Sequence, residues 1–527
     1  MIYHCEDYTC NYWDEGEKLP ERCPQCGRKL LRANEADMTG DDWTALGNTL
    51  SDAEASDKKR MVDCFRKAAY LGSAWGVCNL GICMEQGNGV EADPVQAFWL
   101  DRQAVEMGSL NAVCCLGVCY QYGIGTAPDA KQAAELYCKA AEYGSPRGQM
   151  LLARAFHDGI GVEADAAQDV HWVRAAAYQR YGEGMHRLGE CYAYGDGVEQ
   201  NWEHAVHWFR EAAESGVSVA MVDLGYCYEK GCGVEQSWEQ AFSWYRRGAE
   251  CGDPVSMCNL GLCYKMGHGV EQNWQEAIKW YEQGAQCGNL QSMHNLACCY
   301  ERGEGVKQNM TEAIRWYTAA AEGGNADDMY NLGWLYDHGE GVEQDMKKAI
   351  CWYERAAEQN HPAAMNSLGE CYAMGRGVPR DLETAMEWYR RAAELGEAMA
   401  DYNMGWHLEQ AGKLSEAYAH YRKAADGNDD SAWWALGRFY ENGVVVAQDG
   451  KEARRCYETG EKLGSVKCKM RLARCKLLGI GGRRAKKAGL DLCRQALELA
   501  KESSEKEDYG YEAEMNLLRR TIAENES

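Results

Sequence analysis

Residues 253–288, DPVSMCNLGLCYKMGHGVEQNWQEAIKWYEQGAQCG, decide the fold, because most of the chain repeats them. A leucine followed by a small residue, here Leu260-Gly261, marks the register of each unit, and methionine replaces the leucine once. Between residues 80 and 404 every step is 36 residues. The register residues are 46, 80, 116, 152, 188, 224, 260, 296, 332, 368, 404, 436 and 472. Thirteen units of fixed period predict a solenoid of stacked repeats.

Each unit reads as two helices. Asp253-Pro254 is typical of a helix start, with a carboxylate at the N-cap and proline at the first helical position. Apolar residues then recur at three and four, which predicts an amphipathic helix over 254–266. Gly267-His268-Gly269-Val270 ends it, because glycine readily adopts the left-handed conformation of a C-cap. A second helix is expected from about Trp274 to Gln286.

The small residue after the register leucine indicates close helix packing. Glycine inside a helix costs about 1 kcal/mol relative to alanine, yet every unit has glycine or alanine there. Ala277 in the second helix also recurs, with an aromatic residue three positions later, here Trp280. We expect that aromatic residue to fill the space beside the small residue. One hairpin cannot bury its apolar face alone, so neighbouring units must stack.

The repeated residues resemble the Sel1-like repeat, a relative of the tetratricopeptide repeat with a longer loop between its helices. The matching pattern is A-x-x-x-L-G-x-x-Y-x-x-G-x-G-V followed by A-x-x-W-Y-x-x-A-A-x-x-G, over roughly residues 41–490. The resemblance implies an all-α, right-handed α/α superhelix of about thirteen helix hairpins. The unit near Met404 has Gln410-Ala411-Gly412-Lys413 in place of the Gly-x-Gly-Val loop, which is closer to a plain tetratricopeptide repeat.

The N-terminal residues 1–34 differ in kind from the repeats. Cys5 and Cys10 are followed by Cys23 and Cys26, the latter pair within a Cys-Pro-x-Cys-Gly turn. Two thiolates at this spacing fit one face of a tetrahedral ion. The stretch resembles a rubredoxin-like zinc ribbon, although its first knuckle is Cys-x4-Cys. We expect a four-cysteine structural zinc site, with free thiols as the alternative.

We expect four segments: a zinc-ribbon module at 1–34, a degenerate first repeat at 35–72, the regular repeats at 73–500, and a capping helix with a tail at 501–527. The net charge is −25 in 527 residues, which argues against non-specific binding of nucleic acid or anionic membranes. No signal peptide and no apolar run of membrane-spanning length are visible, so a cytoplasmic location is expected.

The chain has 26 cysteines. Eight share the position three after the register residue, where cysteine serves as a small hydrophobe on the packed face of the first helix: Cys83, Cys119, Cys191, Cys227, Cys263, Cys299, Cys371 and Cys475. A secreted framework with a disulfide in each repeat is the alternative. Among the repeats, Cys251 and Cys258 have the placement for it, and His294 breaks the pattern in the next unit. Reduced thiols are therefore expected.

The resemblance places the first helix of each unit on the inner, concave face of the superhelix. Residues two before and two after the register residue would then point into a groove, with aromatic anchors at Tyr226, Tyr330, Trp334, Tyr402, Trp406 and Trp434. Asparagine precedes the register residue at Asn259, Asn295, Asn331 and Asn403. Its amide could pair with the backbone of a bound peptide. Equally, the asparagines could serve the scaffold itself.

A non-enzymatic adaptor that binds a protein or peptide segment is therefore the leading interpretation, and the acidic composition favours a basic segment. Residues 467–487 contain nine lysines and arginines and no acidic residue. With the ribbon they could bind nucleic acid or another acidic partner, or they could balance neighbouring acids. A β-lactamase-like hydrolase, as associated with some cysteine-rich Sel1-like proteins, is the third reading. It lacks support, because Ser56-x-x-Lys59 has no companion motif.

Overall fold

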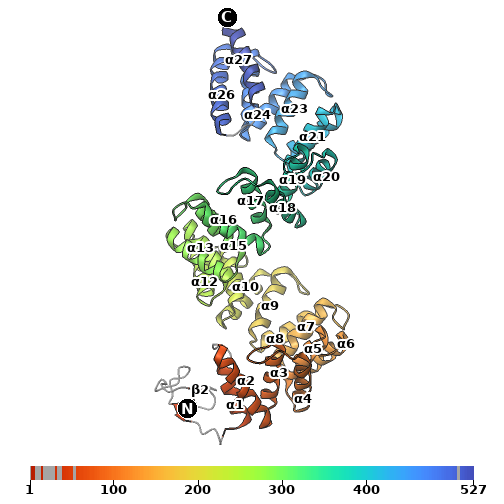
Figure 1. Ribbon diagram of the computed structural model, residues 1–527, viewed down its shortest axis with the longest axis vertical. Helices are drawn as coiled ribbons and strands as arrows, with labels where there is room; N and C mark the ends of the chain where they lie inside the picture. Colours follow the sequence, from red (N-terminus) through yellow and green to blue (C-terminus); the bar gives the residue numbers. More distant parts are fainter. Residues whose placement is uncertain are drawn as a thin grey trace. The chain divides into compact units, whose positions relative to one another are not determined.

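The computed structural model describes residues 2–5, 13–15, 30–32, 38–50, 55–506 and 511–526. The chain divides into two compact units, Met1–Gly284 and Ala285–Ser527. In each unit the helices follow one another as antiparallel pairs in chain order (Figure 1). The thirteen predicted repeats are all present as helix pairs, from α1 and α2 to α25 and α26, and α27 follows the last pair.

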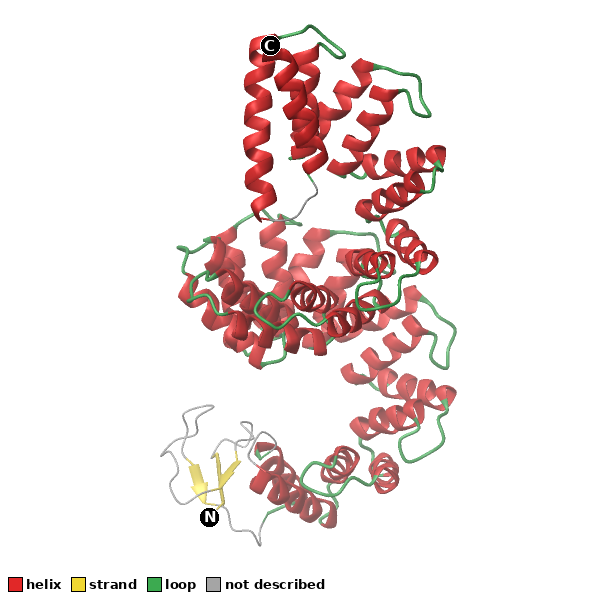
Figure 2. Cartoon of the chain, turned by 45° about the horizontal axis from the view of Figure 1, so that its top comes forward, coloured by secondary structure: helices red, strands yellow, loops and turns green. Residues whose placement is uncertain are grey.

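The first unit contains a short sheet and the helices up to α13. Its strands, yellow in Figure 2, are β1 (Ile2–Cys5), β2 (Trp13–Glu15) and β3 (Leu30–Arg32), in the antiparallel order β2-β1-β3. Its helices are α1 (Gly40–Thr49), α2 (Ala55–Tyr70), α3 (Ala74–Gln86), α4 (Pro94–Glu106), α5 (Leu110–Tyr122), α6 (Ala130–Glu142), α7 (Pro146–Asp158), α8 (Ala166–Tyr178), α9 (Gly182–Tyr194), α10 (Trp202–Glu214), α11 (Ser218–Lys230), α12 (Trp238–Glu250) and α13 (Pro254–Met266).

The boundary between the units falls within α14 (Trp274–Gln286). The helices of the second unit are α15 (Leu290–Arg302), α16 (Met310–Glu322), α17 (Ala326–His338), α18 (Met346–Glu358), α19 (Pro362–Met374), α20 (Leu382–Glu394), α21 (Ala398–Gln410), α22 (Leu414–Asp426), α23 (Asp430–Asn442), α24 (Gly450–Lys462), α25 (Val466–Leu478), α26 (Lys486–Lys506) and α27 (Glu512–Glu526).

Local signals set the helix ends of the repeat that defines the pattern. The side chain of Asp253 accepts a hydrogen bond from the backbone of Ser256, and Pro254 begins α13, as predicted. Gly267 ends it with φ 73°, in the left-handed region. Both α13 and α14 have the predicted bounds. The unit near Met404 also has the predicted short connection, since three residues separate α21 from α22.

The second glycine of the loop has a different role, because it joins successive repeats. A Cβ atom on Gly161 would overlap the backbone carbonyl of Ala130, at the start of the second helix of the preceding repeat. The equivalent Gly269 lies in the same way against Trp238. Both glycines have positive φ. The loop therefore needs glycine for its conformation and for close contact between repeats.

The small residue after the register leucine does face an aromatic ring, but the ring is not the predicted tryptophan. The ring belongs to the next residue of the second helix: Gly261 lies on Tyr281, and Gly333 lies on Tyr353. These tyrosines are fully buried. The tryptophan one position earlier instead lies partly exposed in most repeats, often beneath an arginine, as with Arg355 over Trp352 at 4.3 Å. Our prediction chose the wrong one of two adjacent aromatic residues.

The buried tyrosine hydroxyl has a recurring partner, the polar residue five positions after the register residue on the first helix. In six repeats the hydroxyl donates to a carboxylate or amide oxygen of its own repeat at 2.7–3.4 Å. The pairs are Tyr137–Gln121, Tyr245–Glu229, Tyr317–Glu301, Tyr353–Asp337, Tyr421–Glu409 and Tyr457–Glu441. This bond satisfies a polar group that burial would otherwise leave unpaired.

Candidate functional site

The second unit has a cavity of about 310 Å³ on the first helices of three consecutive repeats, α17, α19 and α21. We call it the aromatic cavity, because two of the predicted anchors line it. Residues that line it include Tyr330, Trp334, Asn366, Glu370, Glu397 and Met399. Five of the six predicted aromatic anchors fall between residues 330 and 434. This cavity lies in the first part of that span.

Packing fixes the orientation of both aromatic anchors. Tyr330 stacks on His361 with ring centroids 5.0 Å apart and lies 5.9 Å from the ring of Tyr353. Trp334 stacks on His338 at 4.3 Å. Burial raises the pKa of Tyr330, although a hydrogen bond with Ser367 opposes this. The two rings are therefore held in place and remain only half-buried at the cavity.

Most charges of the aromatic cavity are neutralised internally. Asp337 accepts hydrogen bonds from Arg376 at 2.9 Å and from the hydroxyl of Tyr353 at 3.4 Å. Glu370 accepts from Asn366 and lies 3.8 Å from Arg376. Glu397, the N-cap residue of α21, differs: its half-buried carboxylate makes no hydrogen bond or ion pair with any residue that the structure describes. The cavity thus offers one uncompensated negative charge beside two aromatic rings.

The other predicted anchors lie outside this cavity. Tyr402 is half-buried against Tyr421, and burial raises its pKa to about 12. Trp406 is 38% exposed and contacts His407 edge-on. Trp434 packs beneath α27, where its indole nitrogen donates to Glu514 at 3.2 Å. Tyr226 is exposed and belongs to the first unit. The predicted anchors therefore do not form one continuous surface, and Trp434 contributes to the packing of α27.

The predicted asparagines fall into two groups, according to whether their side chains are hydrogen-bonded within the fold. Asn403 donates to Asn366 at 3.0 Å and to Glu370 at 3.2 Å, both on the preceding repeat, so its amide holds two repeats together. The side-chain oxygen of Asn295 accepts from Gln291 at 3.4 Å. Asn259 and Asn331 are half-buried, and their side-chain amides make no hydrogen bond within the described part of the chain. The scaffold interpretation holds for Asn403, while Asn331 lies on α17 between the two anchors of the aromatic cavity.

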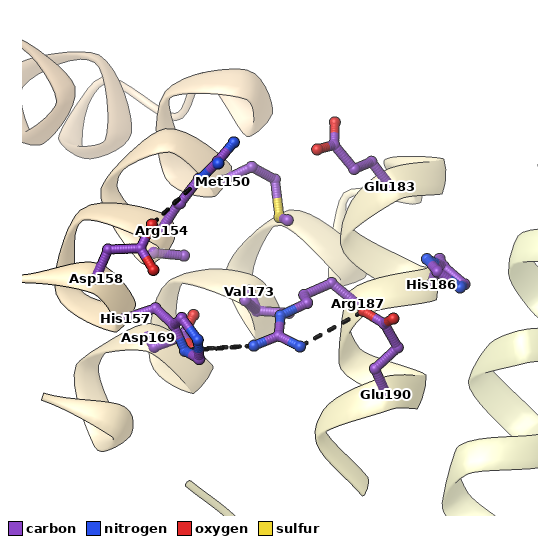
Figure 3. A pocket seen from close by; sticks show the side chains of 11 residues that line it. Met150, Arg154, His157, Asp158, Asp169, Val173, Glu183, His186, Arg187 and Glu190 are labelled. Carbon is purple, nitrogen blue, oxygen red and sulfur yellow. Dashed lines mark hydrogen bonds and ion pairs between the residues drawn. The ribbon is translucent and has the colours of Figure 1, made fainter. Parts of the chain in front are cut away.

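The first unit has a cavity of about 390 Å³ that our sequence interpretation missed. This charged cavity lies among α7, α8 and α9, and Figure 3 shows the guanidinium group of Arg187 between His157 and Asp169 on one side and Glu190 on the other. Arg187 lies 3.5 Å from both carboxylates, and His157 contacts Asp169 at 3.1 Å. Burial raises the pKa of Asp169, opposed by Arg187 and His157.

A sequence signal for the charged cavity existed. Arg187 takes the asparagine position just before the register residue, and His157 takes the position of the tyrosine partner. The same two repeat positions line the aromatic cavity, as Ser367 and Asp337. Reading these positions for charge as well as for aromatic residues would have indicated both sites. Because Arg187 and its neighbours already satisfy one another, this cavity offers less unpaired chemistry to a ligand.

Three of the nine basic residues in the stretch 467–487 are paired within the fold. Arg471 donates to Glu514 at 2.6 Å and to Glu441 at 3.3 Å, and Arg474 also pairs with Glu441. Arg484 donates to Asn525 of α27 at 2.6 Å. These contacts support the interpretation that the stretch balances neighbouring acids.

The predicted zinc ligands Cys10, Cys23 and Cys26 lie outside the described residues, and of Cys5 the structure describes only the backbone, at the end of β1. The ribbon and its metal therefore stay predictions. The eight cysteines of the shared repeat position are all buried, as expected for small hydrophobes in the packed face. Among the described helices, none combines the length and apolarity needed to cross a bilayer.

Comparison with known proteins accords with this architecture. The family model of the Sel1 repeat matches residues 76–109, 112–145, 146–181, 182–217, 218–253, 254–289, 290–325, 326–361, 362–397, 398–429 and 432–465. These matches span well over half of the chain, which therefore belongs to the Sel1 repeat family. Eleven of the thirteen helix pairs are matched, all except α1–α2 and α25–α26. Proteins of this family generally act as scaffolds for protein interactions.

Two solved structures illustrate the relationship. The crystal structure of c5321, a protective antigen of uropathogenic Escherichia coli strains with an SLR fold, has 29% sequence identity and a TM-score of 0.56, covering 88% of this chain and 94% of its own. A Sel1 repeat protein from Oxalobacter formigenes has 28% identity and a TM-score of 0.44, covering 48% of this chain and 100% of its own. No curated protein sequence matches this chain significantly.

Proposed function

We propose that this chain is a non-enzymatic adaptor that binds a protein segment at the aromatic cavity of its second unit. One observation carries the proposal: Tyr330 and Trp334, whose rings are fixed by stacking, share a cavity with Glu397, whose carboxylate has no partner among the described residues. Aromatic side chains in defined pockets dominate the energetics of protein interfaces. A volume of about 310 Å³ suits one or two side chains of a bound segment.

The chemistry of the cavity favours a basic segment. The internal cation Arg376 is already paired with Asp337, so Glu397 remains the group that a ligand would neutralise. An arginine of the partner could stack on Trp334 while its guanidinium group pairs with Glu397. The net charge of −25 would also steer a basic segment toward the chain. Asn331, on the same helix and without an internal hydrogen bond, could pair with the ligand backbone.

A quantitative pull-down from lysate of the source cells tests the proposal. The baits are the intact chain, Trp334→Ala and Glu397→Gln. Partners are then reduced to synthetic peptides, whose affinities are measured by fluorescence anisotropy. We expect Trp334→Ala to weaken binding about thirtyfold, because truncating an aromatic anchor costs about 2 kcal/mol. Glu397→Gln should weaken basic peptides and leave neutral ones unchanged.

Trp99→Ala is the matched control, because Trp99 is 57% exposed on α4, in the other unit. Circular dichroism must show that all variants keep the helical content of the intact chain. Equal retention of partners by Trp334→Ala and Trp99→Ala would contradict the proposal and move the site away from the aromatic cavity.

We also propose that Cys5, Cys10, Cys23 and Cys26 hold a structural zinc ion. The support is their spacing in the sequence. Metal analysis of the purified chain before and after these cysteines are changed to serine would show the loss of one zinc equivalent if the proposal is right.

A further inference from the structure

The repeat formed by α3 and α4 breaks the pattern at one buried position. In the other repeats, the residue of the second helix that packs against the small residue after the register leucine is aromatic or apolar. Where the long loop is present, this residue comes 16 positions after the position of the tyrosine's polar partner on the first helix. Counting from Glu85, that position is Asp101. The carboxylate takes the place of the ring, since Gly81 faces Oδ1 of Asp101. Asp101 is 1% exposed.

Two cysteines approach the same carboxylate from neighbouring helices. Cys78 lies on α3, Asp101 on α4 and Cys115 on α5, so the three belong to three consecutive helices. One sulfur from each cysteine and one carboxylate oxygen all lie within 4.8 Å of one another. Cys78 is 0% and Cys115 4% exposed. The helix packing itself thus brings three potential metal ligands together in a buried site.

The hydrogen bonding of this cluster is incomplete. Oδ2 of Asp101 accepts from the thiol of Cys119 at 3.7 Å, but Oδ1 is buried and has no hydrogen-bond partner. A guanidinium nitrogen of Arg147 lies 3.6 Å from the sulfur of Cys115. Leaving a buried carboxylate oxygen unpaired is costly, and native proteins usually pair such atoms with a donor or a cation.

We propose that Cys78, Asp101 and Cys115 bind a divalent, thiophilic cation, with Zn²⁺ as the expected ion. Thiolate sulfur and carboxylate oxygen are both zinc ligands. The charges balance, because two thiolates and one carboxylate are matched by a divalent ion together with Arg147. Cys119, already hydrogen-bonded to Asp101, is a further donor beside the set. The ion would be structural and would link α3 and α4 to α5 of the next repeat.

The test uses the full chain with Cys5, Cys10, Cys23 and Cys26 changed to serine, so that the N-terminal thiols cannot contribute. Co²⁺ titration is followed by the sulfur-to-cobalt charge-transfer and visible ligand-field bands, and zinc content is measured by mass spectrometry of the metal. We expect about one equivalent of either ion and the absorption of a tetrahedral thiolate site.

Asp101→Tyr is the decisive variant, because it restores the residue that most other repeats have at this position, with Glu85 placed to accept its hydroxyl proton. We expect it to fold and to lose the metal equivalent. Cys115→Ser should also lose it, whereas the control Cys191→Ala, at a buried cysteine outside the cluster, should keep it. An absence of cobalt bands in the four-serine chain, or metal content unchanged by Asp101→Tyr, would overturn the proposal.

Discussion

At the residue scale, the buried tyrosine of the second helix explains two features of the repeat together. In most repeats its ring packs against the glycine of the first helix. In six repeats its hydroxyl pairs with a polar residue five positions after the register residue. The repeat with Phe209 supports this reading, because that ring lies on Gly189 and the partner position holds Ala193. Asp101 stands out because it places a carboxylate at a buried position where the other repeats have an aromatic or apolar residue.

A histidine of the second unit gives a prediction about pH. His294 is hydrogen-bonded to Asp328 at 2.7 Å, and its other nitrogen lies 3.5 Å from the sulfur of Cys298. The bond to Asp328 and then the bond to Cys298 raise the pKa of His294 from 6.5 to about 10. The folded state thus favours the charged ring. This contribution to stability is fully present below pH 6.5 and is lost as pH rises through about 10.

We therefore expect the unfolding free energy of the chain to fall between pH 6.5 and pH 10 by up to about 5 kcal/mol, a decrease that His294→Gln abolishes. Urea unfolding followed by circular dichroism at several pH values measures it. His171→Gln, at an exposed histidine, is the control and should keep the slope of the intact chain. An identical slope in His294→Gln would show that the pair does not titrate as described.

At the element scale, helix bounds were predictable, whereas several side-chain partners were not. The caps of α13 are local, so Asp253 and Gly267 define its ends from sequence alone. The choice between Trp280 and Tyr281 could not be made in this way, because both positions fit a helical period and the packing of the facing helix decides. The contact between Trp434 and α27 could not be predicted for a related reason. The partner of Trp434, Glu514, is 80 residues away, and nothing in the repeat pattern predicts this contact.

Helix α27 is attached by a buried ion pair. Glu514 accepts two hydrogen bonds from Arg471, at 2.6 and 2.7 Å, and one from the indole of Trp434. The side chains of Arg471 and Glu514 are 13% and 7% exposed. We expect Glu514→Ala to destabilise this end by about 3 kcal/mol, because Arg471 loses a buried partner. Hydrogen exchange should then rise across α27.

Arg494→Ala is the control for this prediction. Its ion pair with Asp491 is exposed, and such pairs contribute about 0–1 kcal/mol. Hydrogen exchange followed by mass spectrometry compares the two variants peptide by peptide. If α27 exchanges no faster in Glu514→Ala than in Arg494→Ala, the ion pair is not what attaches the helix.

At the scale of the whole molecule, the packing is local. Most contacts between helices join elements that are at most two apart along the chain, and the hydrogen bond between Trp434 of α23 and Glu514 of α27 is an exception. In such a repeat protein, stability approximates a sum of repeat and nearest-neighbour terms. The aromatic cavity lies in the second unit, and the Cys78–Asp101–Cys115 cluster lies in the first. Damage to one site should therefore leave the other intact.

Leu368→Ala tests this locality. Leu368 is 0% exposed in α19, beneath the aromatic cavity, and its truncation should cost about 2–5 kcal/mol. We expect faster hydrogen exchange in α17–α21 and weaker partner binding, with unchanged exchange in α3–α9 and unchanged metal content. Leu395→Ala, at an exposed leucine of the same repeat, should change none of these. Faster exchange throughout both units would instead mean that the chain unfolds as one cooperative body, and the two sites would then be coupled through stability.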